Sequence, residues 1–225
     1  MCSRYYRRSD GQRIAETFGV GSSTSFDIPP SYNIAPQTFQ PVVHLSEETS
    51  ERELVLMRWG FIPYWAKDAG VGHGTISARC ETVTTGVMFR DAIKQRRCLI
   101  PADGFFVWQE NAPKTKQPYA IGLKDGSLFG FAGLWERCTD KVTKQPLETY
   151  AILTTEPNEL IAPIHDRMPV ILAPKDYERW MSPAGPAQLP VDLLRSYAAE
   201  KMTTWKVNVR VRDVRNDDAT LIGPR

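Results

Sequence analysis

Short apolar runs separated by turn residues recur through most of the chain, and this pattern constrains the fold more than any other feature. Phe39 to Leu45 and Glu53 to Trp59 are apolar, β-branched runs on either side of the polar segment SEETSER. Similar runs occur at Cys98 to Pro101, Phe105 to Trp108, Thr149 to Thr155 and Met168 to Leu172. We predict an α+β fold, a mainly antiparallel sheet or open barrel with peripheral helices, in one domain spanning residues 1–225.

One hairpin and one terminal strand have the clearest strand patterns. Tyr119 to Leu123 and Leu128 to Trp135 flank Asp125-Gly126, a dipeptide typical of hairpin turns. From Trp205 to Arg212 apolar and polar residues alternate strictly. This segment is therefore predicted as a strand with one buried face.

Four segments have the spacing of helices. Gln12 to Phe18 is amphipathic and is followed by Gly19, which favours a helix end, and loop residues continue to about Ser31. The other three are Glu81 to Arg97, Pro174 to Met181 and Val191 to Met202. In the longest of them, Val87 and Ile93 are expected to face inward together with Phe89.

Charge and hydropathy exclude some classes of protein but do not fix a function. The net charge is +2, from 28 basic and 26 acidic residues, so it does not by itself indicate a nucleic-acid binder. Basic residues concentrate near both ends, at Arg4, Arg7, Arg8 and Arg13 and at Lys206, Arg210, Arg212 and Arg215. Each cluster fits either a nucleic-acid surface or an ordinary solvated face. With no signal-peptide core and no run of about 18 apolar residues, we expect a cytoplasmic protein with no membrane contact.

The four cysteines lie far apart and form no C-x-x-C pair. Their spacing favours neither a zinc cage nor a disulfide framework, and no metal or other cofactor is expected. We interpret Cys80, Cys98 and Cys138 as small buried residues.

Cys2 differs because removal of Met1 makes it the first residue of the mature chain. Its α-amine, with an ordinary pKa of about 7.7–8.0, and its thiol, with one of about 8.5, are then both available near neutral pH. An aldehyde condenses with the amine to an imine, and the thiol closes a five-membered thiazolidine, a step with an effective molarity of about 10⁵ M or more. The alternative is a cysteine that merely follows the initiator methionine.

Seven short motifs resemble, in their order, those of the SRAP family, the abasic-site processing proteins once called SOS-response-associated peptidases. They are MCSR at 1–4, YNIAPQ at 32–37, RWGFIPYW at 58–65, SARCET at 77–82, PADGFFVW at 101–108, HDRMPVIL at 165–172 and VRN at 214–216. Each motif alone is weak, but seven in the family order over nearly the whole chain are specific.

The resemblance implies an SRAP-like domain with a basic groove for single-stranded DNA and the mature Cys2 in a pocket on that groove. Cys2 would capture the aldehyde of a ring-opened abasic site and shield the lesion from strand cleavage. His165 matches the family's active-site histidine, and its ordinary pKa near 6.5 suits proton transfer; the alternative is a structural histidine beside Asp166. The peptidase label fits removal of Met1 or autoprocessing. We expect a monomer whose partner is single-stranded DNA containing abasic sites.

The same resemblance implies residues that bind DNA. Arg4, Arg79 and Arg167 match family arginines that hold phosphates, which a guanidinium grips through two parallel hydrogen bonds. Asn33 and Pro36 match a loop that approaches the DNA beside the lesion, although Asn33 also fits a turn former. Stacking on flanking bases is expected at Trp65 and Trp108, at roughly 1–3 kcal/mol for each base, with burial as the alternative.

Two positions depart from the family pattern. Ser77 stands where an Asn is usual; its hydroxyl still donates and accepts, but the side chain is shorter. Val107 stands where the family has its catalytic glutamate, and loss of an acid–base group typically costs about 10²–10⁴-fold in rate. Strand alternation predicts that Glu110 faces away from Val107 and substitutes for it poorly unless a bulge intervenes, and Glu81 of the SARCET motif is the other candidate, which spacing does not establish. We still expect thiazolidine formation, because Cys2 supplies both bonding groups.

Two other functions remain open. One is an N-terminal-nucleophile hydrolase, in which Cys2 attacks an amide and its own α-amine is the base. The other is a module that binds single strands without reacting, which the Val107 departure favours.

Overall fold

The computed structural model describes residues 3–21, 27–66, 69–112, 115–140, 143–183, 185 and 188–224. Its strands are β1 (Tyr5–Arg7), β2 (Ser31–Ile34), β3 (Phe39–Leu45), β4 (Arg52–Trp59), β5 (Ser77–Arg79), β6 (Arg97–Ala102), β7 (Gly104–Ala112), β8 (Thr115–Leu123), β9 (Phe129–Thr139), β10 (Pro146–Thr155), β11 (Met168–Pro169), β12 (Ile171–Leu172) and β13 (Met202–Lys206). Its helices are α1 (Gly11–Phe18), α2 (Ala92–Gln95) and α3 (Tyr177–Met181), with 3-10 helices η1 (Ala69–His73), η2 (Pro174–Asp176), η4 (Val191–Leu193), η5 (Ala199–Lys201), η6 (Val209–Arg212) and η7 (Ala219–Ile222).

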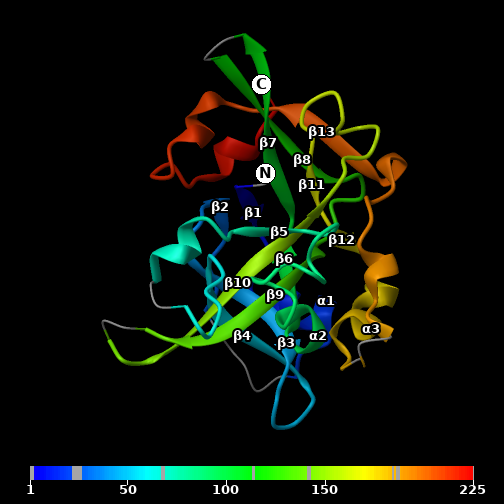
Figure 1. Ribbon diagram of the computed structural model, residues 1–225. Coiled ribbons are helices and arrows are strands. Elements are labelled where there is room, and N and C mark those ends of the chain that lie inside the picture. The colour runs from blue at the N-terminus through cyan, green and yellow to red at the C-terminus, as the bar shows by residue number, and fades with distance from the viewer. Residues whose placement is uncertain are drawn as a thin grey trace.

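The strands form two sheets (Figure 1). The five-stranded sheet has the order β13-β8-β7-β1-β2, and every pair in it is antiparallel. In the eight-stranded sheet, β10, β4, β3, β6 and β9 follow one another, and pairing of β9 with β10 closes them into a ring. Among the described strands of that sheet, the parallel pairs are β10 with β4 and β10 with β5. The predicted mainly antiparallel α+β fold is confirmed.

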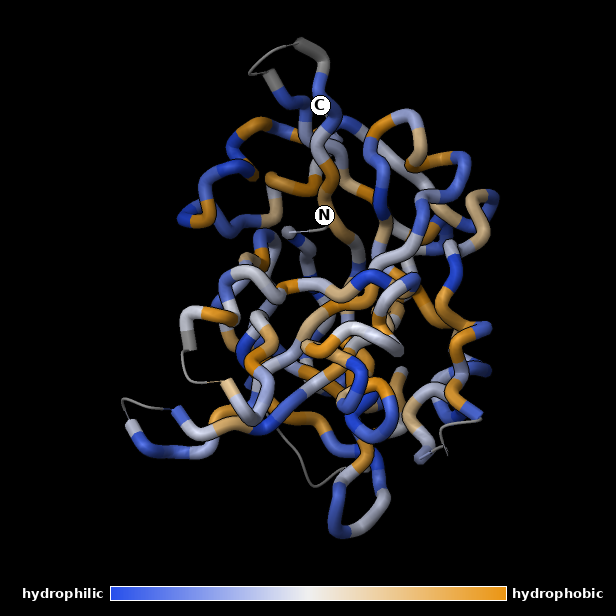
Figure 2. Tube along the Cα trace, in the orientation of Figure 1, coloured by the Kyte–Doolittle hydropathy of each residue, from blue (hydrophilic) through white to orange (hydrophobic). Residues whose placement is uncertain are grey.

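Aromatic side chains shielded from solvent join the two sheets. Tyr5, on β1, packs against Trp59 and Phe131 at ring distances of 5.2 and 5.8 Å. Its hydroxyl lies 2.9 Å from that of Tyr150 on β10, and none of these four residues is more than 1% exposed. Hydrophobic segments run through the middle of the molecule and polar ones along its loops (Figure 2). This packing holds the start of the described chain in a fixed place against the barrel.

Several segments form as the sequence predicts. Helix α1 ends at Gly19, whose φ of 64° is the left-handed conformation that glycine adopts without strain. The segments at 39–45, 53–59, 98–101, 105–108 and 149–155 lie within strands, and 168–172 forms two short strands. Pro174 begins a 3-10 turn that continues into α3. Among the described residues there is no helix long and apolar enough to cross a membrane.

The helix expected over Glu81 to Arg97 is wrong except for its last turn. Turns occupy residues 80–91, and α2 is only four residues long. Val87, expected to face inward, is 58% exposed, whereas Ile93 is buried as expected. The segment ETVTTG contains β-branched residues and a glycine, which disfavour helix, and tertiary contacts decide its path.

The hairpin expected around Asp125-Gly126 is also wrong. Both strands form, and Gly126 has the positive φ of a turn, at 68°. However, β8 pairs with β7 and β13, whereas β9 pairs with β6, β10 and β12. The turn passes the chain from one sheet to the other, which turn chemistry alone does not reveal.

The C-terminal segment differs most from the prediction. Two short 3-10 turns replace the helix expected at 191–202, and β13 ends at Lys206. The strand expected to Arg212 becomes η6, with the Asn208 side chain accepting from the Arg210 amide at 3.0 Å. Val207 and Val211 are fully buried while Val209 is 42% exposed. Buried valines four residues apart fit a helical turn as well as a strand, so the alternation was ambiguous.

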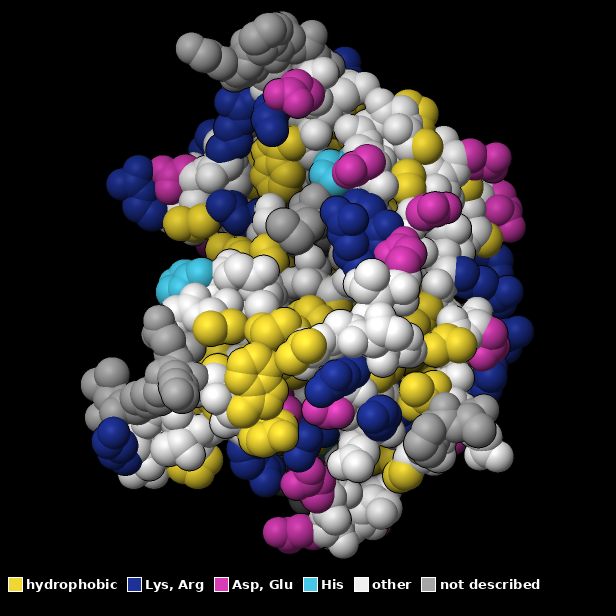
Figure 3. Space-filling view, viewed as in Figure 1, with side chains coloured by type: hydrophobic (Ala, Val, Ile, Leu, Met, Phe, Trp, Pro, Cys, Tyr) yellow, Lys and Arg dark blue, Asp and Glu magenta, His cyan; other side chains and the backbone are white. Residues whose placement is uncertain are grey.

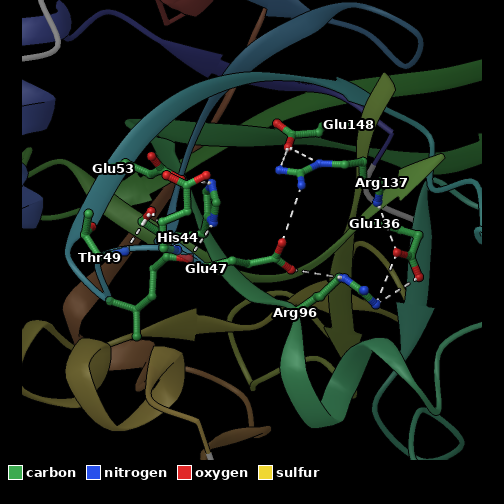
Figure 4. Close-up of polar contacts among 11 residues, drawn as sticks. His44, Glu47, Thr49, Glu53, Arg96, Glu136, Arg137 and Glu148 are labelled. Atoms are coloured by element: carbon green, nitrogen blue, oxygen red, sulfur yellow. Dashed lines mark hydrogen bonds and ion pairs between the residues drawn. The ribbon is translucent and has the colours of Figure 1, made fainter. Parts of the chain in front are cut away.

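A network of ion pairs ties β9 and β10 to the turn between β3 and β4 (Figure 4). Glu47, in that turn, lies 3.4 Å from Arg137 and 3.8 Å from Arg96. Arg137 also lies 2.7 Å from Glu148. The guanidinium groups of Arg96 and Arg137 lie over the Trp135 ring, 5.9 and 5.8 Å from its centroid. The network braces this end of the barrel.

Candidate functional site

A cavity of about 840 Å³ opens beside the start of the described chain. Its walls come from the segment before β1, from β7 and β8, from the loop before β11 and from η6. The lining residues are Ser3, Arg4, Trp108, Glu110, Lys116, Ile164, His165, Asp166 and Arg212. Basic and hydrophobic side chains gather together over this upper part of the molecule in Figure 3. The size is that of a site for a small molecule or a single nucleotide.

His165 reaches the cavity from the loop before β11. Its Nδ1 accepts a hydrogen bond of 3.0 Å from the Arg167 amide and lies 3.1 Å from a carboxylate oxygen of Asp166. Nδ1 also lies 3.1 Å from the Arg167 carbonyl oxygen, so it faces one donor and two acceptors. Burial holds the pKa of His165 below the ordinary value of 6.5, and the Asp166 carboxylate acts in the opposite direction. His165 is thus a neutral imidazole near pH 7, able to accept and pass on a proton.

Ser3 is the first described residue, and it lines the cavity. Strand β7 fixes the chain here, because the Phe106 amide donates to the Arg4 carbonyl at 3.0 Å. Met1 and Cys2, the predicted reactive residue, lie outside the described residues.

Arg4 and Asn33 contact each other and the C-terminal turns. Arg4 Nη1 donates to Asn33 Oδ1 at 2.9 Å and to the Val211 carbonyl at 3.0 Å. The Asn33 amide nitrogen donates to three carbonyls, those of Val211, Asp213 and Asn216, at 2.9–3.1 Å. Asn33 is 4% exposed and lies on β2, not on the loop that the resemblance implies. Its side chain therefore holds the C-terminal segment in place.

Arg167 makes a two-point contact with Glu81, with distances of 2.6 and 3.0 Å, and donates to the Thr154 carbonyl at 2.6 Å. The hydrogen bonds from Arg167 lower the pKa of Glu81 and raise that of Arg167. Arg79, two residues before Glu81, is exposed, and no described residue accepts a hydrogen bond from its guanidinium. Of these two predicted phosphate-binding arginines, Arg79 is the one whose guanidinium forms no hydrogen bond to an acceptor among the described residues.

Ser77 begins β5 and lies opposite Ile152 of β10. It is partly exposed and is not among the residues that line the cavity. The described part of the chain contains no group of three His, Cys, Asp or Glu residues placed to hold a metal ion.

The two predicted stacking tryptophans lie in different surroundings. Trp108 lines the cavity and is partly buried against the cluster that contains Tyr6 and Phe106. Trp65, in a turn after β4, is 44% exposed and lies outside the cavity. Pro36, in the turn between β2 and β3, is partly exposed. Only Trp108 shares the cavity with His165.

The internal cysteines have little thiolate character. Cys98 is fully buried, as expected, whereas Cys80 and Cys138 are only partly buried. Burial nevertheless raises the pKa of all three thiols, to about 12 for Cys80. They are poor nucleophiles near pH 7.

Lys116 is the one charged residue of the described cavity lining that the sequence did not single out, and the motifs did not place Asp166 and Glu110 in that lining. Asp166 stands beside His165 in the HDR motif, and its contact with Nδ1 could have been anticipated from that position. Glu110 and Lys116 are cross-strand partners on β7 and β8, and both line the cavity. Their pairing depends on the register of the two strands, which no motif in the sequence fixes.

Comparison with known proteins gives consistent matches over nearly the whole chain. The family model described as SOS response associated peptidase (SRAP) matches residues 1–214. Abasic site processing protein YoqW of Bacillus subtilis is 40% identical over 225 residues, with 99% of each chain covered. Abasic site processing protein HMCES of Gallus gallus is 31% identical over 87% of this chain and 66% of its own length.

Solved structures share the fold. A protein from Bacteroides thetaiotaomicron has a TM-score of 0.88 and 27% sequence identity, with 100% of both chains covered. A phage-related protein from Bordetella bronchiseptica has a TM-score of 0.71 and 27% identity over 92% of this chain and 94% of its own.

Proposed function

The chain belongs to the SOS response associated peptidase (SRAP) family, and from this premise we propose that it processes abasic sites in damaged DNA. In this proposal the protein binds single-stranded DNA as a monomer and bonds covalently to the lesion through Cys2. The peptidase activity of the family name is then removal of Met1, which exposes the amine of Cys2.

The proposed reaction joins one sugar carbon to two atoms of Cys2. The α-amine adds to the C1′ aldehyde of the ring-opened deoxyribose, and the carbonyl oxygen leaves as water to give an imine. The thiol then adds to the imine carbon, and its proton passes to the nitrogen, which closes the thiazolidine. Nothing is oxidised or reduced, and one water is released for each cross-link.

The observation that carries this proposal is that Ser3 and His165 line the same cavity. In this proposal Cys2, the residue before Ser3 in the sequence, acts at that cavity. A neutral His165 beside the reacting carbon is suited to take a proton from the attacking amine and return it to the departing oxygen.

The charges around the cavity suit a polyanionic strand. Arg4, Lys116 and Arg212 line it, and Arg79 is exposed on β5. Phosphate contacts of this kind position a strand without reading its sequence, as a protein that follows lesions requires. Trp108 would stack on a base beside the lesion from within the cavity.

A denaturing gel of the mature protein with an oligonucleotide carrying one abasic site tests this function. We expect a band of reduced mobility that survives denaturation and is absent with Cys2→Ala or with an undamaged oligonucleotide. A protein that binds the strand but gives no such band would contradict covalent capture.

The second candidate is a module that binds single strands without reacting. It is favoured by Val107, which is 1% exposed in an apolar cluster and offers no exchangeable proton where the family has glutamate. The denaturing gel separates the two functions. A non-reactive module would shift the oligonucleotide in a native gel but would give no shifted band under denaturing conditions.

A further inference from the structure

The cavity contains a carboxylate on the face of β7 opposite to Val107. Val107 pairs with Tyr119 of β8 and packs with Tyr5 and Phe105 in an apolar cluster. Successive side chains of a strand point to opposite faces. The side chain of Val107, which stands at the position of the family's glutamate, therefore faces the interior of this protein.

Glu110 lies three residues later, on the same face as Trp108, and both line the cavity. The register between β7 and β8 is regular through Glu110, which pairs with Lys116, and becomes irregular only between Glu110 and Ala112. Glu110 thus faces away from Val107, as the alternation predicts. The cavity lies on the Glu110 side of the strand. The expectation that Glu110 substitutes poorly for the family's glutamate therefore does not follow.

The two carboxylates of the cavity have different surroundings. Asp166 lies 3.1 Å from His165 Nδ1 and helps to orient the ring. Glu110 is exposed, and no described residue forms a hydrogen bond or ion pair with its carboxylate. Lys116 and Arg212 line the same cavity. Glu110 is therefore the carboxylate that a substrate entering the cavity would meet.

We propose that Glu110 is the proton-transfer group of this cavity and replaces the glutamate that Val107 lacks, an inference that rests on the proposed function. In imine formation the amine nitrogen gains a positive charge as it bonds to C1′. The Glu110 carboxylate takes that proton and delivers it to the oxygen anion on the same carbon, which gives the hydroxyl of the carbinolamine. That hydroxyl leaves as water with the second proton of the amine, which His165 relays from nitrogen to oxygen. The carboxylate is regenerated, and no other reactant is required.

The division of work with His165 follows from the geometry. The His165 Nδ1 faces the Arg167 backbone and Asp166, and the residue lines the cavity from the loop before β11. Glu110 approaches from β7, on a different wall of the cavity. Two proton-transfer groups on different walls suit a reaction in which two protons move in turn from the nitrogen to the departing oxygen.

The test compares rates of cross-linking by the mature wild-type protein, Glu110→Gln, Glu110→Asp and the control Glu51→Gln, which removes the same charge at an exposed site outside the cavity. The probe is a single-stranded oligonucleotide with one abasic site, used from pH 5 to pH 8. We expect the Glu110→Gln rate at pH 7 to fall by about 10²-fold, with partial recovery in Glu110→Asp and no change in the control. The affinity of Glu110→Gln for an undamaged strand should stay within about twofold of that of the wild-type protein.

The outcomes separate the two proposals. If the wild-type protein cross-links and Glu110→Gln matches its rate at every pH, Glu110 has no part in proton transfer, and the proposed function stands. If Glu110→Gln loses affinity for the undamaged strand in proportion to its rate, Glu110 acts in binding, and this inference is overturned. If the wild-type protein forms no cross-link at all, both proposals fail together.

Discussion

Arg167 grips Glu81 through both guanidinium nitrogens, at 2.6 and 3.0 Å, and at the same time donates to the carbonyl of Thr154 on β10. The pair fixes the turn that follows β5 against the barrel. Because the Arg167 side chain is 12% exposed and that of Glu81 is 45% exposed, the contact lies partly in solvent. Its contribution to stability is accordingly modest.

We expect Glu81→Gln to lose about 0.5–1 kcal/mol of unfolding free energy at pH 7. The folded-state pKa of Glu81 is lowered by Arg167, so this stabilisation is present above the ordinary pKa of 4.5 and is lost as the pH falls through the folded value. Urea denaturation at pH 7 and at pH 3 measures it, with Glu159→Gln as the exposed control. A difference between wild type and Glu81→Gln that stays constant with pH would rule out the ion pair as its source.

Asn33→Ala is expected to destabilise the protein by about 1–3 kcal/mol, because three carbonyls of the C-terminal segment lose a buried donor. Asn33→Asp, which keeps the size of the side chain, should be at least as harmful at pH 7, since it turns an oxygen towards those carbonyls. Urea denaturation measures the role of Asn33 in holding the C-terminal segment. The DNA affinity of the folded fraction shows whether Asn33 also contacts DNA. Unchanged stability with weakened DNA binding would contradict the role of Asn33 in holding that segment.

The sequence predicts elements well where one local pattern has one structural solution. Phe39–Leu45 forms as expected, and α1 ends at Gly19, because strand alternation and a left-handed glycine are local signals. The turn at Gly126 is also real, yet which strands it separates depends on contacts distant in sequence. The valines at 207 and 211 fit two periods, and only the cap formed by Asn208 selects the helical turn.

The site shows the same limit. Motif order indicates that His165 belongs to the site, and it lines the cavity. Motifs do not reveal that Asn33 is saturated by backbone carbonyls or that Arg167 is committed to Glu81. Nor do they reveal the face of Glu110, because the position of a cavity relative to a strand is a property of the packed sheets.

The imidazole of His165 should titrate below 6.5, since burial disfavours its charged form. Asp166→Asn should lower the pKa further, because the carboxylate that favours imidazolium is removed. The chain has 3 histidines, so NMR titration of the ring protons, assigned with His165→Gln, resolves each one. Cross-linking by the wild-type protein should persist below pH 6.5. A His165 pKa above 7 would contradict the assignment of a neutral ring.

Trp65→Ala should leave stability nearly unchanged, because the side chain is 44% exposed. If Trp65 stacks on a base, affinity for single-stranded DNA should fall roughly 5- to 150-fold, the equivalent of about 1–3 kcal/mol. Fluorescence anisotropy with a labelled undamaged strand measures this loss. Phe39→Ala, which removes an aromatic ring on β3 that is 54% exposed, is the control. Equal losses in both variants would exclude a specific stacking role.

The buried His44 makes the barrel sensitive to acid. Burial holds its pKa below 6.5, although the Glu53 carboxylate lies 3.1 Å from Nε2 and Glu47 and Glu148 also favour the charged form (Figure 4). The stabilisation by neutral His44 is present above pH 6.5 and falls, by at most about 1.4 kcal/mol for each pH unit, until the folded pKa is reached. Between pH 7 and pH 5, His44→Gln should lose less unfolding free energy than the wild-type protein. Equal slopes in urea denaturation would contradict this.

Mass spectrometry of the N-terminal peptide from the cross-linked product tests covalent capture most directly. We predict a peptide that lacks Met1, carries the deoxyribose remnant with the loss of one water, and has a Cys2 thiol that iodoacetamide no longer alkylates. A peptide that retains Met1 while bound to DNA, or a Cys2 that is alkylated in the bound complex, would contradict thiazolidine formation.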